Sequence, residues 1–243
     1  MSRLRRVILA LPGIALAAAG AIIWTAPDWL VDTIARRYPG CLYRVPTREP
    51  MIALTLDDGP DSISTPLILA ELRKYGARAT FFLISERISS QEALVRRIVA
   101  EGHEIGNHFS LDSPSIRLSQ REFEEDLLRA HRGLAPFARL EWARPASGWY
   151  SQAMVSAMSR HGYRCALGSV YPFDAAIPSV TWAGSYILRN ARPGAIIVLH
   201  DGADRGRRTA RVLARIVPEL QARGYRIVSL SELAATIPSG QLP

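Results

Sequence analysis

Two adjacent carboxylates stand where a predicted strand ends. Asp57 and Asp58 follow the apolar run 51–54 and precede Gly59 and Pro60, a pair typical of a turn. Because neighbouring side chains of a strand point to opposite faces, at least one of these carboxylates should be held in a cleft. There it needs a cation, a hydrogen-bond donor or a raised pKa. The pair therefore indicates acid–base or metal chemistry, although an Asp-Gly turn that caps a helix would look the same.

Other polar side chains also follow predicted strands. They are His108 and Asp112 after 104–106, Arg144 at the end of 142–144, and His200 with Asp201 after 195–199. In a parallel barrel, the carboxyl ends of the strands form the face that carries the active site. This placement predicts that the residues meet at one site.

The spacing of His108 and Asp112 allows a metal site. Residues four apart face the same way if the loop takes a helical turn, and both can then bind one ion. Asp58 would supply a third ligand. One imidazole and two carboxylates suit a divalent cation that keeps water in its open positions. Alone, a histidine in such a loop more often braces the loop than binds a metal.

Strands and helices alternate along the chain from residue 51. The apolar and β-prone runs predict strands at 51–56, 79–84, 104–106, 142–144, 165–170, 195–199 and 226–230. Capping and periodicity predict helices at 64–75, 91–101, 119–134, 151–161, 207–223 and from 231. This alternation predicts an α/β fold with a parallel sheet, as a barrel or an incomplete barrel, with a doubly wound open sheet as the alternative. No glycine-rich phosphate loop follows the first strand, which argues against a nucleotide site.

Four motifs in order resemble the polysaccharide deacetylase family, the NodB-homology group (carbohydrate esterase family 4). They are Thr-Leu-Asp-Asp-Gly-Pro at 55–60, Gly-His-Glu-Ile-Gly-Asn-His-Phe-Ser-Leu-Asp at 102–112, Arg-Pro-Ala-Ser-Gly at 144–148 and Ile-Val-Leu-His-Asp at 197–201. The resemblance covers about residues 51–233. It implies a distorted, incomplete (β/α) barrel of the seven-strand type that removes acetyl groups from carbohydrates with a divalent metal ion.

The resemblance also implies a role for each site residue. It makes Asp57 the general base, His200 the general acid, Arg144 the residue that orients the base, and the backbone N–H of Ser147 an oxyanion donor. It makes Asp58 and His108 metal ligands, and the four-residue spacing from His108 predicts Asp112 as the third. Zinc is the expected ion, with cobalt, manganese or nickel as alternatives.

Three positions depart from the family pattern. The family usually has histidine where this chain has Asp112, and a carboxylate there adds charge and hardness to the metal site. The third motif reads Pro145-Ala146-Ser147 instead of two prolines and a tyrosine. A further motif of the family, an aspartate followed by a tryptophan that comes before the His200 motif, is not recognisable in 168–174, where Asp174 is a candidate to support His200. These positions grip the substrate in the family, so the sugar polymer is expected to be unusual.

The expected substrate is an N-acetylated carbohydrate polymer or oligomer, resembling chitin or peptidoglycan. Two alternatives are a carbohydrate O-acetyl esterase on the same scaffold and a degenerate carbohydrate-binding domain. Retention of His200 favours the amide, because a departing amine needs acid help more than an alkoxide does. The sequence leaves the polymer and its chain length open, and we expect a monomer.

The N-terminus predicts a membrane anchor. Arg3, Arg5 and Arg6 precede an uncharged, mostly apolar run at 7–24, near the short end of what spans a bilayer. The basic flank should stay cytoplasmic and place the rest of the chain outside. A cleaved signal peptide, cut near 17–21, is the alternative, and the protein would then be secreted.

From the N-terminal run and the extent of the resemblance we expect an anchor or signal (1–28), a connector (29–49), a deacetylase domain (50–236) and a tail (237–243). The two cysteines, Cys41 and Cys165, could pair outside the cytoplasm, but a buried small hydrophobe is the commoner role for a residue like Cys165, so the disulfide stays open here. The net charge of +8 comes from scattered arginines rather than a basic stripe, so nucleic acid is not an expected partner.

Overall fold

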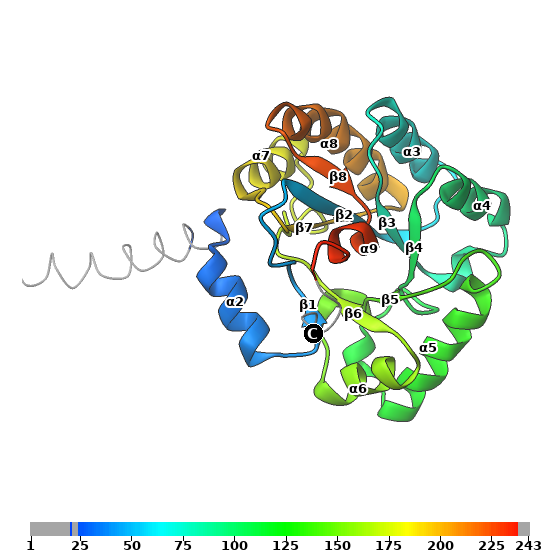
Figure 1. The fold of residues 1–243 in the computed structure, drawn as a ribbon. Helices are drawn as coiled ribbons and strands as arrows, with labels where there is room; N and C mark the ends of the chain where they lie inside the picture. Colours follow the sequence, from blue (N-terminus) through cyan, green and yellow to red (C-terminus); the bar gives the residue numbers. More distant parts are fainter. Residues whose placement is uncertain (1–19, 21–23, 238–243) are drawn as a thin grey trace, which may run out of the picture.

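A single curved parallel sheet forms the centre of the molecule (Figure 1). The computed structural model describes residue 20 and residues 24–237. The strands in that part of the chain are β1 (Cys41–Leu42), β2 (Met51–Gly59), β3 (Thr80–Leu83), β4 (Glu104–Asn107), β5 (Trp142–Ala143), β6 (Arg164–Ala166), β7 (Ile196–His200) and β8 (Arg226–Val228). Every strand pair among them is parallel. The predicted α/β fold with a parallel sheet is confirmed.

The sheet forms an open ring of strands. The order is β1-β6-β5-β4-β3-β2-β7, with β8 paired to β2 off this path. The gap between the two ends is crossed by isolated bridges, Arg44 with Ala195 and Val170 with Ile197. The described sheet thus has eight strands where seven were expected, since the short β1 joins from the predicted connector.

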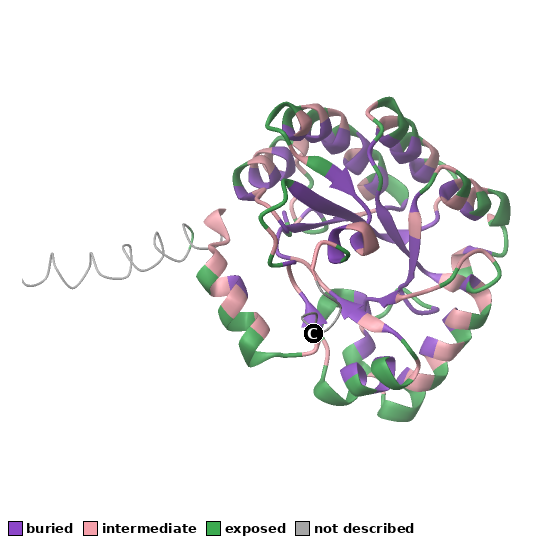
Figure 2. Ribbon diagram, viewed as in Figure 1, coloured by how far each residue is buried: buried purple, intermediate pink, exposed green. Residues whose placement is uncertain are grey.

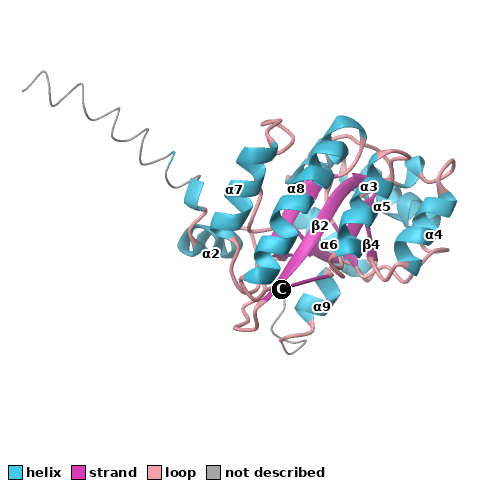
Figure 3. Cartoon of the chain, turned by 90° about the horizontal axis from the view of Figure 1, so that it is seen from above, coloured by secondary structure: helices cyan, strands magenta, loops and turns pink. Residues whose placement is uncertain are grey.

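Helices surround the strands on the outside (Figure 3). They are α2 (Asp28–Arg37), α3 (Ser64–Lys74), α4 (Glu92–Ala100), α5 (Gln120–Leu134), α6 (Gln152–Arg160), α7 (Val180–Asn190) and α8 (Ala203–Ala222), while the short helix α9 (Leu230–Ala234) lies at one end of the ring of strands (Figure 1). Figure 2 shows that the strands are buried and that the outer helix faces are exposed. The apolar faces of these helices and the nearly continuous apolar strands bury one another, as a two-sided parallel sheet requires.

The short helix α9 closes one end of the ring. The helix buries Leu230, Leu233 and Ala234 against a cluster of strand side chains that includes Phe82 and Trp142. The helix is also hydrogen-bonded to residues at the amino ends of strands: Trp142 Nε1 donates to Ser231 Oγ at 2.8 Å, and Leu230 N donates to Thr80 Oγ1 at 2.8 Å. With the amino end closed, the carboxyl ends of the strands are left as the accessible face.

The predicted connector, residues 29–49, contains ordered structure. It holds α2 and β1, and β1 pairs with β6 in the register Cys41–Cys165 and Leu42–Ala166. Cys41 and Cys165 form a disulfide with a Cα–Cα distance of 4.5 Å, which answers the question that the sequence left open.

Two helices differ from the prediction. Helix α7 was not predicted, and α8 begins at Ala203 rather than at Arg207.

Residues 167–170, predicted as the end of a strand, instead leave β6 and cross to β7, where Ser169 N donates to Ile196 O at 3.1 Å. Gly168 permits this crossing, because a Cβ there would lie 2.4 Å from Val198 Cγ2.

The predicted anchor over residues 1–28 lies mostly outside the described residues. In the part that the structure describes, no helix has the length and apolar character needed to cross a membrane.

Candidate functional site

A pocket of about 880 Å³ opens at the carboxyl ends of the strands. Seven of the eight predicted site residues line it: Asp57, Asp58, His108, Asp112, Arg144, Ser147 and His200. The eighth, Asp174, contacts His200 at its edge. The pocket also contains aromatic side chains from distant parts of the chain, namely Tyr38, Tyr43, Trp149, Tyr150 and Tyr171. A concave site with a few convergent polar groups is the usual form of a small-molecule site.

A bulge at the end of β2 lets both adjacent carboxylates reach this pocket. The pairing of β2 with β3 shifts register between Asp57 and Gly59, and Asp58 has a φ of +72°. A bulge re-aims a side chain that would otherwise point to the opposite face. Asp57 and Asp58 are therefore both buried and both line the pocket, which a regular strand would not allow.

The buried guanidinium group of Arg144 is hydrogen-bonded to Asp57. Its Nη1 donates to Asp57 Oδ1 at 2.6 Å and to Thr55 Oγ1 at 2.8 Å. Nε donates to the backbone oxygen of Ala166 at 2.9 Å, and Nη2 donates to that of Leu167 at 2.6 Å. Burial lowers the pKa of Arg144, and the Asp57 carboxylate works against that shift. A guanidinium fixed at this many points orients the Asp57 carboxylate.

His108 and Asp58 form the second pair. His108 Nδ1 lies 2.7 Å from the backbone oxygen of Arg144, so this nitrogen carries the proton and Nε2 faces Asp58 Oδ1 at 3.4 Å. Burial raises the pKa of Asp58, but the contact with His108 and the nearby cationic groups outweigh burial and lower it to about 2. Burial lowers the pKa of His108, and the charge of Asp57 together with Asp58 raises it overall.

These two groups fit a divalent cation. Ligands bound at about 2.1 Å to a tetrahedral ion lie about 3.4 Å apart, the separation of His108 Nε2 and Asp58 Oδ1. A metal-binding histidine almost always donates its other ring N–H to an oxygen, as His108 does to Arg144. The observed geometry supports Asp58 and His108 as two ligands. Among the described residues, no group of three or more His, Cys, Asp or Glu side chains is arranged to hold a metal ion.

Asp112 lies at the pocket but is held by arginines. Its Oδ2 is 2.9 Å from Arg87 Nη2 and 3.9 Å from Arg205 Nη2, and its side chain is 49% exposed. Arg205 Nη2 is also 3.1 Å from Asp58 Oδ2. Residues 110–113 form bends rather than a helical turn, so the condition for pairing Asp112 with His108 is not met. Its role as a metal ligand remains a prediction.

His200 lies opposite Asp57 on the neighbouring strand, and its ring is hydrogen-bonded to Asp174. Asp57 and His200 are register partners in the parallel pair of β2 and β7. His200 Nδ1 lies 2.9 Å from Asp174 Oδ1, and the backbone N–H of His200 donates to Asp174 Oδ2 at 3.1 Å. Burial lowers the pKa of His200, but Asp174 outweighs burial and raises it. The other ring nitrogen, Nε2, is thus left to act in the pocket.

Ser147 lies in the short 3₁₀ turn Ala146–Gly148 and has a φ of +68°. This backbone conformation is uncommon for a residue other than glycine, and such strain is frequent at functional sites. The residue lines the pocket, as an oxyanion donor must. Its participation through the backbone N–H remains a prediction.

Sequence reasoning missed several residues of the pocket. Arg205 was placed before its helix rather than in the first turn of α8. Arg87, which pairs with the pocket residue Asp112, lies in a short 3₁₀ helix that carries no motif. Tyr38 and Tyr43 belong to the predicted connector. The only sequence signal was the unusual arginine content, which does not distinguish these arginines from the others.

Comparison with known proteins gives the family. A family model described as polysaccharide deacetylase matches residues 44–166. The chain is 38% identical over 194 residues to a peptidoglycan-N-acetylglucosamine deacetylase of Bacillus cereus, covering 79% of this chain and 91% of that protein. The chain belongs to the polysaccharide deacetylase family. This membership confirms the resemblance drawn from the four motifs.

Two further proteins extend the comparison. The chain is 35% identical to a chitooligosaccharide deacetylase of Bradyrhizobium, covering 75% of this chain and 90% of that protein. A family 4 acetyl xylan esterase from Clostridium thermocellum, solved in complex with a cobalt ion, is 30% identical. Its structure aligns with a TM-score of 0.71 and covers 76% of this chain and 90% of that one. The relatives therefore include hydrolases of carbon–nitrogen bonds and an esterase.

Proposed function

We propose that this protein is a metal-dependent deacetylase that removes N-acetyl groups from an N-acetylglucosamine polymer or oligomer outside the cytoplasm. One observation carries the proposal. A single pocket holds an arginine-oriented aspartate, a carboxylate-supported histidine and a buried aspartate–histidine pair. Hydrolysis of an amide needs a base, an acid and a stabiliser of charge, and these three pairs can supply all of them.

Asp58 and His108 would hold the divalent cation, with Asp112 as the proposed third ligand. When bound there, the cation would acidify a water molecule and polarise the acetyl carbonyl. Zinc suits an imidazole with two carboxylates, and cobalt, manganese and nickel are alternatives.

Asp57 would act as the general base. Arg144 keeps one of its oxygens oriented at 2.6 Å, and the other oxygen is left to accept the proton of the attacking water.

His200 would act as the general acid. An amine leaves only when it is protonated, and Asp174 stabilises the protonated imidazole that gives up this proton. Asp57 and His200 are register partners on adjacent strands, which lie about 4.8 Å apart, and this closeness supports their proposed roles as base and acid. The backbone N–H of Ser147 would donate to the oxygen on which charge develops.

An O-acetyl esterase is the second candidate. The similarity to an acetyl xylan esterase supports it, because the same base and the same cation can serve an ester. The bracing of His200 by Asp174 supports the amide, since an alkoxide needs less acid help to leave.

We also propose that the catalytic domain lies outside the cytoplasm and is tethered by the N-terminal segment. The basic flank followed by an uncharged run supports this orientation. The disulfide between Cys41 and Cys165 supports it independently, because such bonds persist in oxidising compartments.

Acetate release tests the proposed function. The full chain would be incubated with N-acetylglucosamine oligomers and with peptidoglycan, after metal removal by a chelator and again after addition of Zn²⁺ or Co²⁺. We expect acetate from at least one substrate and only in the presence of the metal. No acetate from either substrate with any of the metals would reject the proposal.

A further inference from the structure

The segment before the family match builds part of the pocket. The match begins at residue 44, yet Ile34, Tyr38 and Tyr43 line the same pocket as Asp57 and His200. Ile34 belongs to α2, and Tyr38 and Tyr43 flank β1. The substrate site therefore extends onto residues that the deacetylase motifs do not include.

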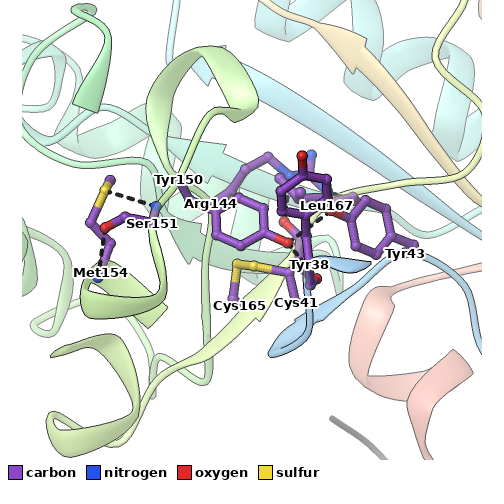
Figure 4. The surroundings of a disulfide bond; sticks show 10 residues. Tyr38, Cys41, Tyr43, Arg144, Tyr150, Ser151, Met154, Cys165 and Leu167 are labelled. Atoms are coloured by element: carbon purple, nitrogen blue, oxygen red, sulfur yellow. Dashed lines mark hydrogen bonds between the residues drawn. A yellow bond between two sulfur atoms is a disulfide. The ribbon is translucent and has the colours of Figure 1, made fainter. Parts of the chain in front are cut away.

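This segment is tied to the barrel at two points, and an ion pair fixes α2 to the residues that follow β1. Cys41 is bonded to Cys165, so β1 is crosslinked to β6 (Figure 4). Leu167 N donates to Leu42 O at 2.8 Å, directly beside the backbone oxygen of Leu167 that holds Arg144. Farther out, Arg44 makes a bidentate pair with Asp32 of α2, at 2.8 and 2.9 Å. Such fixation gives the segment a defined position at the pocket.

Three tyrosines are joined along this side, and we call them the tyrosine wall: Tyr38, Tyr43 and Tyr150. The Tyr150 hydroxyl donates to the backbone oxygen of Tyr38 at 2.7 Å. Since its proton is used there, the Tyr43 hydroxyl donates to Tyr150 Oη at 2.8 Å. Figure 4 shows the three side chains near the disulfide and near Arg144. The hydrogen bonds fix the phenol groups of Tyr43 and Tyr150, whereas Tyr38 is joined to them through its backbone oxygen and stays 52% exposed.

The chemistry of the wall suits a sugar ring. A hexosamine has apolar C–H faces and polar hydroxyl edges, and a tyrosine offers an apolar ring with a polar end. The pocket volume of 880 Å³ is near the upper end for sites that take drug-sized molecules. It is larger than one acetamido group needs, so there is space for a neighbouring sugar.

We propose that the tyrosine wall binds a second sugar residue of the oligomer, next to the sugar that loses its acetyl group. This inference rests on the proposed function for its choice of ligand. The disulfide holds the wall in place, so the N-terminal segment and the redox state of Cys41 and Cys165 would both affect the affinity for oligomers but not that for a single sugar.

Binding of chitin oligomers tests this inference without turnover. The full chain with Asp57→Asn would be titrated with N-acetylglucosamine pentamer and with N-acetylglucosamine itself, by calorimetry. In this background, Tyr38→Ala should weaken pentamer binding about 2- to 12-fold, the value of one lost aromatic contact, and should change monosaccharide binding by less than about twofold. The matched control is Trp29→Ala, which removes a 59% exposed aromatic side chain that lies outside the pocket on α2, the helix that ends just before Tyr38.

A second experiment tests the disulfide. The double variant Cys41→Ser/Cys165→Ser, made in the Asp57→Asn chain, would be titrated with the pentamer, and circular dichroism would check that it folds. We expect a weaker pentamer affinity in the same direction as for Tyr38→Ala. The inference is overturned if the pentamer fails to bind the parent protein or binds no better than the monosaccharide. It is also overturned if Tyr38→Ala and Trp29→Ala have the same pentamer affinity. Because acetate release is measured separately, a failure of the proposed function is distinguishable from a failure of the wall.

Discussion

At the scale of single residues, the two adjacent aspartates differ through their partners. Asp57 is held by Arg144, which is 87 residues away in sequence. Asp58 faces His108 and Arg205, and its pKa is lowered to about 2 in spite of burial. The sequence predicted that such carboxylates need partners, and the motifs identified Arg144 and His108. It did not reveal the bulge that turns both side chains to one pocket, because a bulge depends on pairing between strands.

Replacement of each aspartate should separate the two roles. Asp57→Asn should lower acetate release about 10²–10⁴-fold and leave the metal affinity nearly unchanged, since only the base is lost. Asp58→Asn should instead weaken metal binding, because a ligand is lost. Calorimetric metal titration and acetate assays on both variants check this. Acetate release near the wild-type rate in Asp57→Asn would refute the base assignment.

Asp112 provides the test of the metal site. If it is the third ligand, Asp112→Ala should lower the metal affinity by about tenfold or more, since even lost supporting contacts cost that much. Asp204→Ala is the control, because Asp204 is an exposed acidic residue in the first turn of α8 outside the pocket. Equal affinities in both variants, measured by titration with Zn²⁺, would show that Asp112 serves only to hold Arg87 and Arg205.

The support of His200 by Asp174 predicts a pH effect. A raised pKa keeps His200 protonated to higher pH, so a reaction that needs the acid is lost as the pH rises through that pKa. Asp174→Asn removes the negative charge and lowers the pKa of His200. The high-pH limb of kcat/KM should then move to lower pH by about one unit or more. An unmoved limb would contradict the role of His200 as an acid supported by Asp174.

At the scale of elements, prediction succeeded where pattern and caps were strong. Helix α5 begins at the predicted capping box, with Ser119 and Glu122 bonded reciprocally. Helix α7 was missed because its sequence, with β-branched and aromatic residues and a glycine, has weak helical propensity. It forms through packing: Trp182 and Tyr186 contact Trp24, whose ring centroid is 4.6 Å from that of Trp182. Local propensity cannot reveal contacts with a segment so distant in sequence.

The link between β1 and β6 predicts a redox-dependent stability. The disulfide closes a loop over a sequence separation of 124 residues, which restricts the unfolded chain. Its removal in Cys41→Ser/Cys165→Ser should lower the free energy of unfolding by about 2–5 kcal/mol. Urea unfolding with and without a reductant measures the difference. The reductant should destabilise the wild type and have no effect on the double variant. No effect on the wild type would contradict the prediction.

At the scale of the whole molecule, the closed amino end and the open carboxyl end of the barrel explain why distant motifs meet. Site residues come from β2, β7 and the segments that follow β4, β5 and β6, and the parallel order brings all of these ends to one face. The sequence predicted this meeting from strand ends alone. The sequence did not reveal that residues 29–49, expected to be a connector, supply part of the pocket. They reach it because β1 pairs with β6 and is crosslinked to it.

The proposed anchor predicts where the protein is found. Full-length chain should sediment with membranes, and a protease added outside intact cells should reach the catalytic domain. A soluble extracellular form lacking about the first twenty residues would favour the cleaved signal instead. Recovery of the full-length chain in the cytosol would contradict both versions of the proposal.

The central claim is that this pocket hydrolyses an amide of an amino sugar. Parallel measurement of acetate and of new primary amine from N-acetylglucosamine pentamer, with the metal-loaded full chain, tests it most directly. We expect equal amounts of the two products, and loss of both in Asp57→Asn. Acetate released from an O-acetylated xylan without any amine from the pentamer would contradict the claim and establish the esterase.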